Sequence, residues 1–359
     1  MKESVVYILG AGCSVRYGYP LARGFLDALK KYGSILDQRP NCDQLKRCVA
    51  ETVGLMETFN SPTIDRLVLQ IEEDLGRQPR APFGSQDLNY ARLENLAARQ
   101  NRNAKLATAA LFNELEDNAR KSGLQGYRDF LNTIFEGDRG TDALRSTPNR
   151  VLSFNYERLF EFAFIDHFKL QVGMDCYGPS WLNSGFDFSR KQPADIVPDR
   201  FSFLKLHGTA AMLVADHYGK PRYGWSKSLS GADQPIDDHS FWPTAQTSSQ
   251  SPREQPEPLI AFPYEKDRAR ETNTSFLFDH YIRTIWAAAM QLAASADKLC
   301  VIGYSFDPND RKAILELLRS NRANCDIFVQ NPDAERICSE MRLHHSDLTS
   351  RLKPLSNLF

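Results

Sequence analysis

Short apolar runs of four to six residues recur along the chain, and each ends near a Gly, Asn, His or Pro. Most are rich in β-branched or aromatic residues. Near-continuous hydrophobicity at this length is typical of strands that are buried on both faces of a parallel sheet. The runs are Val5–Leu9, Arg150–Phe154, Phe201–Leu206, Leu259–Phe262, Leu299–Ile302 and Asp326–Val329.

Helical patterns lie between several of these runs. The clearest are Leu21–Tyr32, Tyr156–Phe168 and Asn309–Arg319, each with an apolar stripe at helical spacing. Strands that alternate with helices predict an α/β fold. We therefore expect a Rossmann-like, doubly wound parallel sheet of about six strands.

Two long segments interrupt the alternation. Residues 35–147 carry helical stretches without convincing strands, which predicts a helical insertion. Residues 210–257 are rich in Pro, Ser, Gly and Asp, which predicts a loop-rich insertion, and loops this long are often functional. We expect residues 1–34 and 148–335 to form the α/β domain that contains this second insertion, and residues 336–359 to form a C-terminal tail.

The charge balance limits the classes of partner. Lys and Arg number 44 and Asp and Glu 45, so the net charge is −1, and a generally basic nucleic-acid-binding protein is excluded. The stretch Gly76–Lys105 is locally basic, with six Lys or Arg residues against Asp87 and Glu94. Such runs usually form a solvated helical face. Nucleic-acid contact is expected only there or through a partner protein.

Cysteine usage and hydropathy indicate the compartment. The seven cysteines are scattered and form no Cys-x-x-Cys pair, so a disulfide framework is not expected and a reducing cytosol fits. The apolar run Val5–Cys13 is too short and too poorly flanked to be a signal peptide. No stretch reaches the about 18 apolar residues of a membrane span. We expect a cytoplasmic protein with no membrane contact.

A glycine-rich turn follows the first apolar run. Gly10-Ala11-Gly12-Cys13-Ser14 allows close approach of the backbone to a ligand, and a helix N-terminus after such a turn favours phosphate. Val15 stands where the dinucleotide fingerprint has its third glycine. A tight turn between a strand and a helix explains the two glycines equally well.

Five segments, taken in order, resemble the sirtuin family. The glycine turn is followed by Gly18-Tyr19-Pro20 and Arg23, which resembles that family's opening motif. The other four also follow or end apolar runs. They are Ser153-Phe154-Asn155-Tyr156-Glu157, Leu204-Lys205-Leu206-His207-Gly208, Ile302-Gly303-Tyr304-Ser305-Phe306 and Val329-Gln330-Asn331-Pro332.

The resemblance implies chemistry on NAD as substrate, at the bond between nicotinamide and ribose. Asn155 would hold ribose hydroxyls and a water, and His207 would act as general base. Arg23 matches a position near phosphate and ribose, although Leu21 and Ala22 depart from the family pattern. The remaining nucleotide-binding positions would be Gly10, Ala11, Gly12, Cys13, Ser14, Gly303, Tyr304, Ser305 and Asn331.

Structural explanations exist for the same residues. His207 alone is more often a strand-end histidine packed under a loop, and Asn155 alone can cap a helix that starts at Tyr156. Cys13 is interpreted as a small packing residue, and a role as a redox-sensitive thiol is the weaker interpretation. The ordered motifs favour the functional interpretation of Asn155 and His207.

The interval between His207 and Gly303 holds one cysteine, Cys300. Protein-deacylating sirtuins carry a zinc module with two Cys-x-x-Cys pairs there, so the resemblance implies no zinc and argues against deacylation. Water is then the acceptor, and the expected products are nicotinamide and ADP-ribose. Together with the motif variants, Pro263 and Lys266 resemble sirtuin-like domains of bacterial anti-phage systems, which deplete NAD in abortive infection.

Two alternatives stay open. A protein deacylase or ADP-ribosyl transferase would need an acyl peptide or target protein for turnover. A non-catalytic module that binds NAD or ADP-ribose would bind without turnover. Because an NAD-destroying enzyme must be held inactive, we also expect a homo-oligomer or a partner such as an ATPase or a sensor protein.

Overall fold

A computed structural model describes residues 2–77, 88–170, 201–217, 220–227, 236–241, 256–262, 277–306, 311–321 and 325–355. Its main feature is a parallel sheet of six strands in the order β3-β2-β1-β7-β8-β9. The chain moves outward from β1 to β3, returns to β7 beside β1, and moves outward again to β9. This is the doubly wound, Rossmann-like α/β arrangement. The strands are β1 (Val5–Leu9), β2 (Arg150–Ser153), β3 (Ser202–Lys205), β7 (Lys298–Ile302), β8 (Asp326–Gln330) and β9 (Leu352–Leu355).

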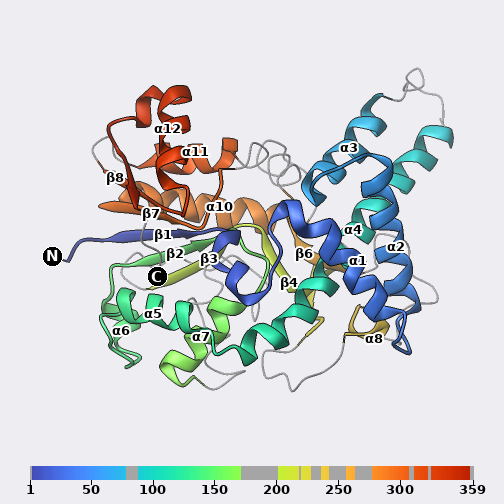
Figure 1. Ribbon diagram of the computed structural model, residues 1–359, viewed down its shortest axis with the longest axis horizontal. Helices are drawn as coiled ribbons and strands as arrows, with labels where there is room; N and C mark the ends of the chain where they lie inside the picture. The colour runs from blue at the N-terminus through green and yellow to red at the C-terminus, as the bar shows by residue number, and fades with distance from the viewer. Residues whose placement is uncertain are drawn as a thin grey trace.

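Both faces of the sheet are covered by helices, as the near-continuous apolar strands predicted (Figure 1). One face packs against α10 (Leu277–Ser295), α11 (Arg311–Ser320) and α12 (Ala334–His344). The other packs against α5 (Gln125–Ile134), α6 (Ala143–Ser146) and α7 (Leu159–Phe168).

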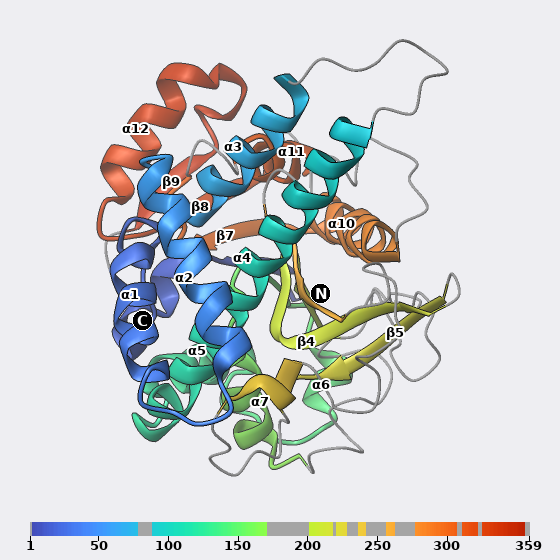
Figure 2. The ribbon, with the colours of Figure 1, turned by 90° about the vertical axis from the view of Figure 1, so that its right-hand side faces the viewer.

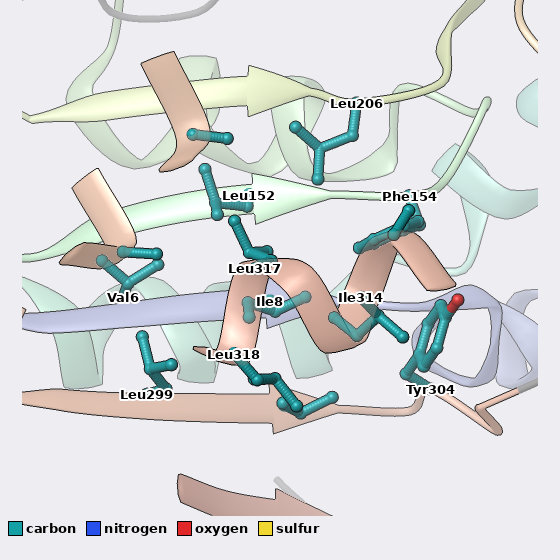
Figure 3. Close-up of a cluster of buried hydrophobic side chains, with 14 of the residues drawn as sticks. Val6, Ile8, Leu152, Phe154, Leu206, Leu299, Tyr304, Ile314, Leu317 and Leu318 are labelled. Carbon is teal, nitrogen blue, oxygen red and sulfur yellow. The ribbon is translucent and has the colours of Figure 1, made fainter. Parts of the chain in front are cut away.

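Successive side chains along a strand point to opposite faces of the sheet, so alternate residues pack against the two helix layers. Val6 and Ile8 of β1 join the α10–α12 layer, whereas Leu9 joins the α5–α7 layer. Figure 3 shows the first layer, where strand residues face Ile314 and Leu317 of α11. Burial of this kind stabilises the fold by about 25 cal/mol per Å² of apolar surface.

A second group of elements packs beside the sheet (Figures 1 and 2). It joins four long helices and one short helix to a small antiparallel sheet of order β5-β4-β6. Apolar residues of all four helices share one core with Ala210, Leu213 and Ile260 of that sheet. The elements are α1 (Phe25–Leu36), α2 (Asp43–Thr58), α3 (Ile64–Arg77), α4 (Leu88–Lys121), β4 (Gly208–His217), β5 (Lys220–Trp225), α8 (Asp238–Phe241) and β6 (Glu257–Ile260).

Three sequence expectations differ from this arrangement. The apolar run Leu259–Phe262 was expected in the main sheet, but β6 pairs antiparallel with β4. Residues 210–257 were expected to be loop-rich, yet they carry most of β4 and all of β5. The range 336–359 was expected to be a tail, yet it contributes the sixth strand, β9, which pairs with β8.

The basic stretch Gly76–Lys105 is not uniformly a solvated face. Arg102, near the middle of α4, donates to the Pro256 carbonyl at 2.9 Å and 3.3 Å. Lys105 is buried and lies 3.7 Å from Glu257. Two cations of the basic stretch, Arg102 and Lys105, therefore hold α4 against Pro256 and the first residue of β6. Within the described ranges, no helix is both long and apolar enough to cross a membrane.

Candidate active site

The carboxyl ends of four strands meet at one edge of the sheet. Leu9 of β1 is level with Ser153 of β2 and Ile302 of β7, and Ser153 is level with Lys205 of β3. The segments that leave these strands carry Gly10, Asn155, His207 and Gly303. In open α/β sheets, ligands bind at this edge beside the point where the strand order reverses, which here lies between β1 and β7.

The turns after β1 and β7 touch through their backbones. Gly10 N–H donates to the Ile302 carbonyl at 2.9 Å, and Gly12 N–H donates to the Gly303 carbonyl at 2.8 Å. A Cβ on Gly303 would lie 2.6 Å from the Cys13 nitrogen, and the φ of Gly303 is +65°. Gly10 and Gly12 are similarly crowded by Gly303 and Tyr304. The close contact of two turns therefore requires these glycines.

The segment after β1 is not the start of an α-helix. It forms three short 3₁₀ turns, η1 (Ala11–Cys13), η2 (Val15–Tyr17) and η3 (Ala22–Gly24), and α1 begins only at Phe25. Gly18, with φ +89°, ends the second turn. The expected helix N-terminus at the glycine turn is therefore absent, and the expected helix Leu21–Tyr32 begins four residues late. The Cys13 and Ser14 N–H groups donate within the turn, to Gly10 and Ala11.

A buried polar cluster lies beneath this turn. Ser14 Oγ donates to Glu157 Oε1 and lies 3.0 Å from the hydroxyl of Tyr127. The Tyr127 hydroxyl also donates to Glu157 Oε1 at 3.1 Å. Asn155 Nδ2 lies 3.3 Å from both Ser14 Oγ and Glu157 Oε1. The cluster thus joins the β1 turn, the segment after β2 and helix α5.

Asn155 is oriented by this cluster and does not cap a helix. Helix α7 begins at Leu159, and its N-cap residue is Arg158. The Asn155 amide nitrogen faces Ser14 and Glu157, so its oxygen Oδ1 points to the other side. That oxygen is buried and has no hydrogen-bond partner among the described residues, and the same holds for Glu157 Oε2. Buried polar atoms are normally paired, so an unpaired acceptor here suits a ligand that donates hydrogen bonds.

His207 packs against the segment that carries Asn155. Its ring meets the Phe154 ring edge-on with centroids 4.9 Å apart, and the Tyr156 ring with centroids 5.8 Å apart. The residues on both sides of Asn155 therefore contact the histidine, which is itself buried. Its carbonyl accepts from Ala261 N–H at 2.9 Å, and the Leu206 carbonyl accepts from Trp286 Nε1 at 3.1 Å.

The other predicted residues differ in their connection to this cluster. Tyr304 packs its ring 4.8 Å from the Phe154 ring, and Asn331 Nδ2 donates to the Tyr304 carbonyl at 3.3 Å. Ser305 and Ala11 are exposed next to these turns. Arg23 lies on η3 with an exposed side chain, and within the described ranges it makes no hydrogen bond or ion pair with the cluster. Pro263 and Lys266 lie outside the described residues.

Cys13 behaves as the expected packing residue. Its thiol donates to the Ile302 carbonyl at 3.3 Å. Burial, with a smaller effect of the Glu157 carboxylate, raises the pKa of Cys13 to about 12. A thiol with this pKa is almost fully protonated at neutral pH and is a poor nucleophile.

Sequence reasoning assigned no role to the residues that support the site from below. Glu157 stands two positions after Asn155 and its motif was recognised, but Tyr127 is 113 positions from Ser14 and carries no local signal. The buried Lys205 donates to the Glu157 carbonyl and pairs with Glu161 at 3.0 Å. Burial raises the pKa of Glu161 despite this lysine. Among the described residues, no group of three or more His, Cys, Asp or Glu side chains is placed to hold a metal ion.

Comparisons with known proteins add little to this geometry. No protein-family model and no curated protein matches the sequence. Among solved structures, one of Sir2 with a deacetylated p53 peptide and 3′-O-acetyl ADP ribose aligns with 91% of this chain and 81% of its own, at 13% identity and a TM-score of 0.33. The fold assignment therefore rests on the strand order and pairing of the chain itself, which make it an α/β protein with a Rossmann-like sheet.

Proposed function

We propose that this protein is an NAD hydrolase that cleaves the bond between nicotinamide and ribose. The observation that carries the proposal is the buried, unpartnered acceptor Asn155 Oδ1 at the carboxyl edge of the sheet, in a segment whose Phe154 and Tyr156 rings contact His207. A ribose offers hydroxyl donors to such an acceptor. The order of the five sequence motifs supports NAD as the source of that ribose.

The reaction does not require the protein to protonate the leaving group. Nicotinamide departs as a neutral molecule with the electrons of the C–N bond, so it needs no proton, and the ribose passes through an oxocarbenium-like state. Asn155 Oδ1 would accept a hydrogen bond from a ribose hydroxyl or the attacking water. His207 would take the proton that the water loses as its oxygen bonds to the ribose carbon.

We assign the adenosine and diphosphate side of the substrate to the β1 and β7 turns. The N–H groups of Gly10, Gly12, Cys13 and Ser14 are engaged within the protein. Phosphate contacts would therefore come from other donors of the predicted set, such as the exposed Ser305 hydroxyl and the Arg23 guanidinium. Asn331 would act through the turn that it holds beside Tyr304.

The proposal is tested by following NAD loss with purified protein at high concentration, which favours self-assembly, and resolving the products by chromatography. We expect nicotinamide and ADP-ribose, and a loss of rate of about 100-fold or more in Asn155→Ala and in His207→Ala. His344→Ala, which changes an exposed histidine, is the matched control. Native rates in both site variants would contradict the assignment. Turnover only with an acyl peptide or protein acceptor would favour the transferase alternative, and binding without turnover the non-catalytic module.

We further propose that the hydrolase is an NAD-depleting effector of anti-phage defence, held inactive until triggered by self-assembly or by a partner protein. The resemblance of its motifs to such systems supports this role. The test is cellular NAD after phage challenge, with Asn155→Ala as control. Protection and NAD loss are expected only with the native protein, and protection by the variant would contradict the role.

A further inference from the structure

Helix α5 contributes one hydroxyl to the polar cluster of the site. Tyr127 is almost completely buried, and its ring stacks on Tyr17 with centroids 5.7 Å apart. Its ring also meets Phe160 edge-on at 6.4 Å. The ring is thus held on two sides, and the hydroxyl is delivered to Ser14 and Glu157.

The hydroxyl of Tyr127 acts as a hydrogen-bond donor. Burial and the Glu157 carboxylate raise its pKa well above 10, so it keeps its proton at any physiological pH. Glu157 Oε1 therefore accepts from Tyr127, from Ser14 and from the Asn155 amide. Three donors on one carboxylate oxygen restrict that oxygen to a single position.

The position of Glu157 Oε1 decides which atom of Asn155 is available to a ligand. An amide rotated by 180° would bring its oxygen against the carboxylate, where two acceptors repel. The nitrogen therefore stays on the Glu157 side, and Oδ1 stays on the free side. The available atom of Asn155 is an acceptor, which selects a ligand group that donates.

We propose that Tyr127 is a positioning residue for Asn155, acting through Glu157 and Ser14. This inference rests on the proposed function, because Asn155 is taken as the residue that meets the ribose. Tyr127 belongs to the range that the sequence assigned to a helical insertion, so this range contributes to the site itself. Removing its hydroxyl leaves Glu157 Oε1 with two donors, Ser14 and the Asn155 amide, and loosens the position from which it orients that amide.

A double-mutant cycle on ADP-ribose binding separates this role from a general packing role. The four proteins are the native chain, Tyr127→Phe, Asn155→Ala and the double variant, each titrated with ADP-ribose by calorimetry. We expect Tyr127→Phe to weaken binding about tenfold, because it removes a buried hydrogen bond to a charged group. In the Asn155→Ala background the same change has no further effect, since there is no amide left to orient.

Tyr17→Phe is the matched control. The Tyr17 hydroxyl accepts from Gly126 N–H at 2.9 Å, so the variant removes a neighbouring buried-ring hydroxyl that does not touch Glu157. Its affinity for ADP-ribose should stay within about twofold of native. Equal losses in Tyr17→Phe and Tyr127→Phe, or effects of Tyr127→Phe and Asn155→Ala that multiply, would overturn the proposal.

The outcomes keep the two proposals apart. A non-additive cycle with no NAD hydrolysis supports the positioning role and contradicts the hydrolase. Hydrolysis with an additive cycle supports the hydrolase and contradicts the positioning role. A native protein that neither binds ADP-ribose nor hydrolyses NAD contradicts both, because Asn155 would then not meet the ribose on which both proposals rest.

Discussion

Gly303 holds a conformation that the turns of the site require. Its φ of +65° lies in the left-handed region, which costs a residue with a side chain about 1–2 kcal/mol. The added Cβ would also press on the Cys13 nitrogen. We expect Gly303→Ala to lower the free energy of unfolding in urea by about 2 kcal/mol or more.

Gly54 provides the comparison for this change. It lies within α2, and a Cβ added there meets no atom within 4 Å. Gly54→Ala should therefore stabilise the protein by about 0.5–1 kcal/mol. If Gly303→Ala were as stable as the native protein, the two turns could separate without cost, and the close contact would not hold the site together.

A functional residue was predictable from the sequence where it stands in a recognisable motif next to an apolar strand. Asn155 and His207 follow apolar strands, and the register of β2 and β3 places the segments that carry them at the same edge of the sheet, where the Phe154 and His207 rings are in contact. Tyr127 was not predictable, because its partners come from distant parts of the chain. The phosphate role of the glycine turn was expected from a following helix, but the local chain forms 3₁₀ turns instead.

At the scale of elements, α2 depends on a residue from a distant segment. Both carboxylate oxygens of Asp238 accept N–H groups at the start of α2, from Gln44 and Leu45, at 2.9 Å each. Unpaired N–H groups at a helix start are costly, and a negative charge is favourable there. We expect Asp238→Ala to lower the unfolding free energy by about 1–2 kcal/mol, measured by urea denaturation.

Asp43 is the control for the helix cap. It also lies in the first turn of α2, but its side chain is exposed. Asp43→Ala removes the same charge without removing a cap, so a loss of only a few tenths of a kcal/mol is expected. Equal losses in the two variants would show that Asp238 acts through charge alone.

The elements that the sequence missed have short or mixed patterns. Strand β9 contains Lys353 and Pro354 and has no apolar run, and an edge strand tolerates proline. Strand β6 was recognised as a strand, but its apolar pattern does not say which sheet it joins. Pairing with β4 determines which sheet β6 joins, and β4 lies some 45 positions earlier along the chain. Most of β4 falls in the range that the sequence predicted to be loop-rich.

Across the whole molecule, a buried charge network joins α4 to the segment that carries Asn155. The Arg158 guanidinium donates to both oxygens of Glu116 at 2.9 Å and 2.7 Å, and also to the Lys227 carbonyl at 2.9 Å. Lys227 pairs with Asp117 at 2.8 Å. Three parts of the chain, at α4, before α7 and after β5, thus meet in one buried set of charges.

We expect Glu116→Gln to destabilise the protein by about 3 kcal/mol, because it leaves the buried Arg158 without a full countercharge. Urea denaturation followed by circular dichroism measures this loss. Glu340→Gln changes one partner of the exposed Arg336 pair and should leave the unfolding midpoint unchanged. Similar midpoints for both variants would show that the buried pair of Glu116 and Arg158 adds nothing measurable to the stability.

The backbone of His207 also has a structural role, because it lies between two sheets. Strand β3 ends at Lys205 and β4 begins at Gly208, so two residues, Leu206 and His207, separate a strand of the parallel sheet from a strand of the antiparallel one. Both of their carbonyls are hydrogen-bonded, and Gly208 has a φ of +75°. The link therefore cannot change its length without breaking these hydrogen bonds. In protein engineering, one inserted or deleted residue here would shift the register of one sheet against the other. Redesign of the β4–β5 hairpin should therefore keep residues 205–208 intact.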